Sequence, residues 1–78
     1  MLYNELMRID KFNNLGFWQK KLLKKLKKDE IEFCKKFLIS NENLSNNDFA
    51  FKVNRLFIDE KNPPKNRHIM VEIIGACI

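Results

Sequence analysis

The chain has 78 residues, enough for a single domain but not for a large core, since a chain of this size buries only about 60% of the surface that its unfolded form exposes. It carries 15 basic and 10 acidic residues, a formal net charge of +5, and 45% of its residues are hydrophobic. Two cysteines and one histidine are too few for a disulfide-rich scaffold or for a zinc site with four Cys and His ligands.

Residues 2–12 predict a short helix, because apolar residues recur on one side of it; a strand is the alternative for so short a segment. A pair of asparagines and then Gly16 predict its end and a turn. Charges throughout this segment leave no apolar region of a signal peptide, and no apolar run approaches the roughly 20 residues that span a bilayer. We therefore expect a soluble, cytoplasmic protein.

The net charge is concentrated in the next segment. Between Phe17 and Lys36 lie eight basic and three acidic residues, so this segment alone carries +5. At 100° per residue its lysines gather on one helical face, opposite the apolar residues. These lysines form what we call the basic face: Lys20, Lys21, Lys24, Lys25, Lys27, Lys28 and Lys35. A localised cationic face indicates where a partner makes contact.

The same segment fits either one helix or two. Its apolar residues, among them Trp18, Leu22 and Leu26, keep a helical period through residue 37, which favours one long helix with this side in the core. Asp29 followed three residues later by Glu32 instead resembles a capping box at a new helix start. We expect two helices, over about 16–28 and 30–39.

The clearest helix start on the chain follows a loop at residues 40–45. Ser45 is a good N-cap with Asp48 at the N3 position, and Leu44 is placed to pack on Phe49. Apolar residues then follow with helical spacing at Phe49, Val53, Leu56 and Phe57. A helix over about 46–59 is expected, ended by the two prolines that follow, because a residue before proline avoids the helical region.

The C-terminal segment, residues 66–78, fits two secondary structures. As a helix capped by Asn66 it places its apolar residues in pairs four residues apart; as a strand, its Ile and Val content is equally suitable. A helix is expected, since no second strand is available for pairing. The chain as a whole then predicts an all-α fold, with residues 1–78 forming one small antiparallel bundle of about four helices.

Few residues are available for catalysis. Cys34 and His68 could supply a nucleophile and its base, but Cys34 lies on the predicted core face and no third group is placed to orient the histidine. The two glycines are far apart, so no phosphate-binding loop exists. Cys34 and Cys77 are expected as buried free thiols, with a disulfide between them as the alternative. We expect no enzyme activity, no metal site and no cofactor.

Binding to a larger partner is therefore the expected function. Four apolar residues lie off the apolar stripes of their helices and are candidate anchors for an interface: Phe12, Phe17, Phe51 and Ile58. Burial at helix ends is the alternative for them. With the basic face, these anchors suit docking on a protein, including one in a nucleoprotein complex. Small inhibitors or accessory factors of mobile genetic elements are an analogy for such a chain.

Three other partners stay open. Direct binding to DNA or RNA through the lysines would be salt-sensitive and largely independent of sequence, because arginine, the residue that forks onto guanine, is scarce. Residues 17–28 also resemble cationic helices that lie on anionic membranes, although the bundle core needs the same leucines. A second copy of the chain is a further candidate.

Overall fold

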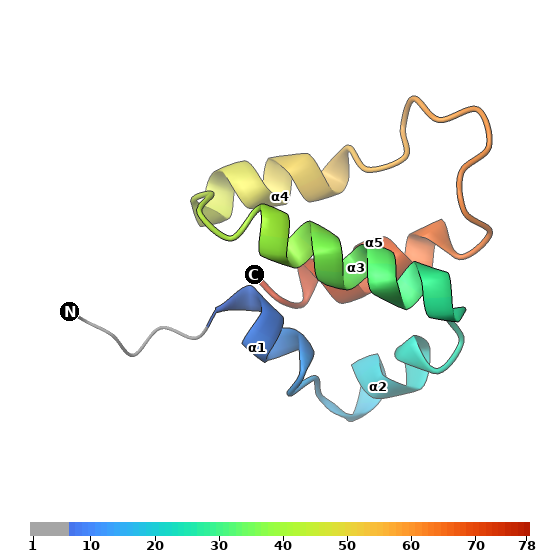
Figure 1. The fold of residues 1–78 in the computed structure, drawn as a ribbon, viewed down its shortest axis with the longest axis horizontal. Coiled ribbons are helices and arrows are strands. Elements are labelled where there is room, and N and C mark those ends of the chain that lie inside the picture. Colours follow the sequence, from blue (N-terminus) through green and yellow to red (C-terminus); the bar gives the residue numbers. More distant parts are fainter. Residues whose placement is uncertain (1–6) are drawn as a thin grey trace.

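The computed structural model describes residues 7–78, and in this range the chain forms five helices and no strand (Figure 1). Their bounds are α1 Arg8–Phe12, α2 Phe17–Leu23, α3 Lys28–Ser40, α4 Asn46–Asn54 and α5 Arg67–Gly75. The prediction of a small all-helical fold is confirmed, and the five helices correspond to the five expected segments, although the bundle was expected to have about four helices. Leu2 and Leu6 of the predicted first helix lie outside the described residues.

The chain forms two helices between residues 17 and 40, as predicted, and the break lies earlier than expected. After α2, the amides of Lys25 and Leu26 bond to carbonyls only three residues back, which tightens the last turn. Lys27 is then extended, with φ −79° and ψ 163°, so a continuous helix is excluded. Its amide donates to Oε1 of Glu30 at 2.8 Å. The acid that caps the start of α3 is therefore Glu30, and the predicted pairing of Asp29 with Glu32 is wrong.

The core lies mainly between α3 and α5. One stripe of α3, formed by Glu30, Cys34 and Leu38, is buried. It faces α5, whose contacts also reach α2 and α4. The C-terminal segment forms the predicted helix, with its pairs of apolar residues four residues apart, and the strand alternative is wrong. Its fully buried side chains are Met70, Ile73, Ile74 and, just after the helix, Cys77.

Helix α4 is shorter than the predicted helix over 46–59. Its start is as expected, because Oγ of Ser45 accepts from the amide of Asp48 at 3.2 Å. After Asn54 the chain turns, and Phe57 adopts a left-handed conformation with φ 65°, which no helix can continue through. The Phe57 ring lies 5.4 Å from that of Phe33, a contact that helps to hold this conformation.

The arrangement places α2 and α4 far from each other. Figure 1 shows α3 crossing over α5, with α4 on one side of this pair and α1 and α2 on the other. A long connection without regular structure runs from α4 to α5 along one end of the molecule. Features carried by α2 and by α4 are therefore presented on different sides of the protein.

Candidate partner-binding surface

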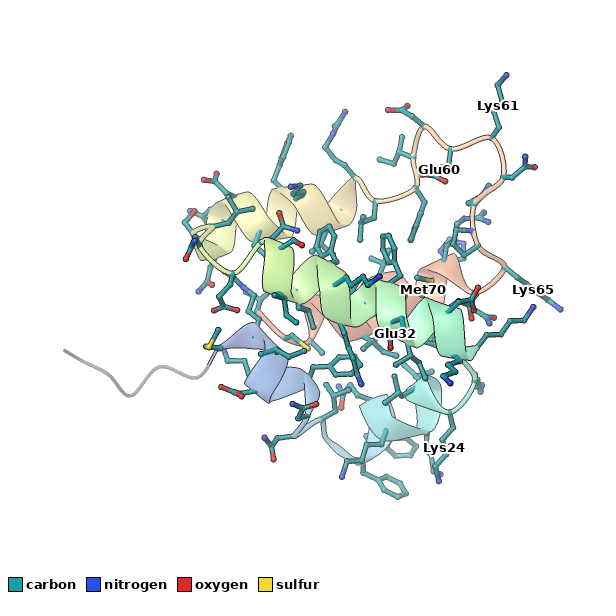
Figure 2. All side chains as sticks on the ribbon, in the orientation of Figure 1. Lys24, Glu32, Glu60, Lys61, Lys65 and Met70 are labelled. Atoms are coloured by element: carbon teal, nitrogen blue, oxygen red, sulfur yellow. The ribbon has the colours of Figure 1, made fainter. Side chains whose placement is uncertain are left out.

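The basic face curves around a corner rather than along one helix. Lys20 and Lys21 lie on α2, and the turn after it and the first residue of α3 carry the next four lysines, all of them exposed. Lys35, on α3, is half-buried. The one-helix alternative, which would line these lysines along a single helix, is excluded because the extended Lys27 separates α2 from α3. Figure 2 shows Lys24 projecting outward from this corner.

Two aromatic side chains are exposed beside these lysines. Phe17 is 66% exposed and Trp18 is 70% exposed, and their rings meet edge to face with centroids 5.4 Å apart. Nζ of Lys21 lies 4.6 Å from the Phe17 centroid and 5.1 Å from that of Trp18, within the range of cation–π attraction. The pair is therefore held in place by local contacts and still offers most of its apolar surface.

The exposure of Trp18 overturns its expected place in the core. Of the residues expected there with it, Leu26 is buried and Leu22 is half-buried. Helix α2 has only seven residues and none of them is fully buried. A helix of two turns contacts its neighbours over a small area, and Trp18, in its first turn, is left uncovered.

A groove lies between α1, α2 and α3, and three residues in or just after α2, the helix that carries this pair, line it. It has a volume of about 370 Å³. Phe12 and Leu15, both buried, form its floor, and Leu23 and Ile31 are half-buried in its wall. Its charged lining residues are all lysines of the basic face: Lys20, Lys24 and Lys35.

The four predicted apolar anchors do not form one surface. Phe12 is only 5% exposed, so its prediction as an exposed anchor is wrong: Arg8 and Phe12, four residues apart, form the buried side of α1. Phe51 and Ile58 are 65% and 59% exposed, but they lie on α4 and in the turn after it. Only Phe17 is close to the basic face.

Phe51 and Ile58 belong to a separate surface. The guanidinium carbon of Arg55 lies 5.3 Å from the Phe51 centroid. Ile58 lines an open groove of about 490 Å³ together with Arg67, His68 and Glu60. This groove mixes acidic and basic groups, so it lacks the single sign of charge that marks the groove beside α2.

Among residues 7–78, the polar side chain with the most hydrogen bonds is that of Arg8, which the sequence alone does not single out. It is 6% exposed, and its guanidinium donates to the carbonyls of Asn41, Glu42 and Leu44 at 2.8–3.1 Å and to Oδ1 of Asn46 at 3.1 Å. It also lies 4.1 Å above the centroid of the Phe49 ring. Arg8 thus joins α1 to the corner between α3 and α4, a structural role. The one signal in the sequence is its spacing of four residues from Phe12.

The candidate catalytic pair is not assembled. Cys34 is fully buried, and burial, followed by the nearby Cys77, raises the pKa of its thiol to about 12. Burial likewise raises the pKa of Cys77 to about 11. Both thiols are free and therefore protonated at neutral pH, which makes them poor nucleophiles. His68 is exposed near the start of α5, beside the separate groove.

Glu30 is a further buried ionisable group, and its role is structural. The Lys27 amide and then the Asn66 side chain, which donates to Glu30 Oε1 at 3.0 Å, lower the pKa of this carboxyl. Asn66 also donates to the Lys25 carbonyl at 3.3 Å, so it ties the start of α5 to the corner between α2 and α3. Asn66 occupies the N-cap position of α5, as predicted, but its side chain makes no capping bond there.

No protein-family model matches this chain, and no curated protein or solved structure is significantly similar to it. Within residues 7–78, no group of three or more His, Cys, Asp or Glu side chains is placed to hold a metal ion. None of the helices in this range has the length and hydropathy needed to cross a membrane.

Proposed function

We propose that this chain is a non-catalytic basic binding protein of the cytoplasm that docks on a larger protein, as an inhibitor or accessory factor. Phe17 and Trp18 are the anchors, and the lysines of the basic face around α2 contact acidic groups of the partner. The observation that carries the proposal is the exposure of two adjacent aromatic rings within the most cationic part of the chain.

The energetics of these two rings favour burial in an interface. An aromatic side chain buries roughly 150–250 Å² when it is covered, and Trp is enriched among the residues that dominate binding energies. In the free protein both rings are exposed to water, so the favourable free energy of burying them is not gained until a partner covers them. An acidic partner surface would cover the rings and pair with Lys21, which already lies over both of them.

The test is capture of a partner from nuclease-treated lysate of the source cells, with a matched pair of variants. A double variant, Phe17→Ala with Trp18→Ala, removes the anchors. Phe51→Ala with Ile58→Ala removes equally exposed apolar groups from the other side of the molecule. We expect the wild-type protein and the second variant to retain one stoichiometric partner that the first variant loses. Equal capture by all three proteins, or no reproducible partner, would refute the proposal.

Direct nucleic-acid binding is the second candidate function, and the same aromatic pair supports it. Exposed Trp and Phe rings beside lysines can stack on the bases of a single strand while the lysines neutralise phosphates. Its signature is affinity that falls steeply with salt, with a slope that becomes shallower when Lys20, Lys24 and Lys28 are replaced by alanine. Negligible binding to single-stranded DNA and RNA at low salt would exclude it.

A further inference from the structure

The groove between α1, α2 and α3 combines an apolar floor with a single sign of charge. Buried Phe12 and Leu15 lie at its base, and Lys20, Lys24 and Lys35 supply all of its charged groups. Lysines usually point into water, away from one another, because like charges repel. Three of them around one apolar depression leave a positive potential that an acidic ligand would relieve.

The size and shape of the groove select the kind of ligand. Its volume of about 370 Å³ lies near the lower end of the roughly 300–1,000 Å³ typical of small-molecule sites. It is also open along one side, whereas a small-molecule site encloses about 70–90% of its ligand. An open, shallow groove instead suits one face of a helix, which inserts a few bulky side chains and leaves the rest in water.

Nucleic acid fits this groove less well than it fits the aromatic pair. A base needs an exposed flat ring to stack on, and the ring in the groove, that of Phe12, is buried. The half-buried wall residues Leu23 and Ile31 are aliphatic and match aliphatic or aromatic side chains better than a sugar–phosphate chain.

We propose that this groove binds an acidic amphipathic helix of the partner protein, with one or two bulky apolar side chains on its floor. Carboxylates beside those side chains would pair with Lys20, Lys24 and Lys35. The inference rests on the proposed function, in which the partner is a protein, and adds the chemistry of the segment that is recognised. It makes the groove a second contact, in addition to Phe17 and Trp18.

The test uses a fluorescein-labelled synthetic peptide of about 14 residues, four helical turns, with Leu and Phe at every third or fourth position and Glu and Asp elsewhere. Fluorescence anisotropy should give a dissociation constant below about 1 mM. Two control peptides, one with Lys for every acid and one with Ala for Leu and Phe, should each bind at least about tenfold more weakly.

Variants of the protein locate the contact. Asn13→Trp places a large side chain at an exposed position of the groove lining, and Lys35→Glu reverses a charge that belongs to the groove; each should weaken peptide binding about tenfold or more. Lys61→Glu makes the same change in net charge on the loop after α4 and should change binding less than about twofold (Figure 2). Circular dichroism confirms that each variant is folded.

The outcomes separate this inference from the proposed function. If the acidic peptide does not bind, or if Lys35→Glu and Lys61→Glu weaken binding equally, the groove is not an acidic-helix site. Partner capture that depends on Phe17 and Trp18 can still succeed in that case. If single-stranded DNA competes with the peptide for the groove, and Asn13→Trp weakens both, recognition of an acidic helix is also refuted.

Discussion

Replacing Arg8 should destabilise the fold more than replacing any other charged residue that the structure describes. Its guanidinium makes four hydrogen bonds to neutral oxygens around the α3–α4 corner and lies over the Phe49 ring. One of the carbonyls it reaches is that of Asn41, the C-cap residue of α3, which has no partner within the helix. Without this side chain, the corner loses all four of these bonds to α1 and keeps the one from the backbone amide of residue 8 to Oε1 of Glu42, at 2.9 Å.

The expected loss of stability depends on which of these hydrogen bonds water can replace once the Arg8 side chain is removed. A hydrogen bond to a charged group contributes about 1.5–3 kcal/mol, but Glu42 and Leu44 are only half-buried, so water can replace two of the bonds. Asn41 is 8% exposed, and its carbonyl keeps the hydrogen bond from the amide of Leu44 at 3.2 Å but loses the stronger one from the charged guanidinium. Nε of Arg8 is buried without a hydrogen-bond partner, which costs the folded state desolvation energy. Removing it offsets part of the loss of stability. The net loss for Arg8→Ala is about 2–4 kcal/mol, including the cation–π contact.

Urea denaturation followed by far-UV circular dichroism measures this loss. The exposed Trp18 would be an insensitive fluorescence probe. Arg8→Lys keeps the charge but not the planar fork, and should lose roughly half as much stability. Arg67→Ala, at the exposed start of α5, is the control and should change stability by less than about 0.5 kcal/mol. Variants of Arg8 as stable as the control would refute the structural role given to this residue.

Two further predictions concern buried ionisable groups. The pKa of Glu30 is lowered, so its carboxylate stabilises the fold above the ordinary carboxyl pKa of 4.5, and this contribution is lost as pH falls below that value. In urea denaturation, Glu30→Gln should therefore cost about 1 kcal/mol of stability near neutral pH and nothing at acid pH. A constant difference across pH would contradict this. Cys34 and Cys77 should resist a thiol reagent such as Ellman's reagent in the native protein and react fully in denaturant; rapid labelling of the native protein would show that they are not buried.

Local signals predicted most of the helices. Ser45 caps α4 as its spacing from Asp48 indicated, and the paired apolar residues of the C-terminal segment form the buried side of α5. Both signals act within a few residues along the chain, which is why they can be read without the fold. Helix ends were less predictable: Phe57 leaves the helical conformation although its spacing continues the stripe of α4.

The choice of side chains for the surface depended on neighbours that the sequence does not reveal. Phe12 and Trp18 exchanged places relative to expectation, one buried and the other exposed. Periodicity defines the apolar side of each helix, but burial depends on which helix covers that side and how far it extends. Asn66 illustrates the same limit, because its main partner, Glu30, is 36 residues away in the chain.

The sequence by itself determined the helical class, the break of the lysine-rich segment into two helices and the concentration of charge around α2. These properties follow from local spacing, capping and composition. Only the tertiary structure decided that Arg8 joins α1 to the α3–α4 corner, that Phe17 and Trp18 stand beside the lysines, and that three lysines surround an apolar groove. These three features depend on contacts between elements distant in sequence, or on how much of a helix its neighbours cover. Local periodicity encodes neither of these two causes.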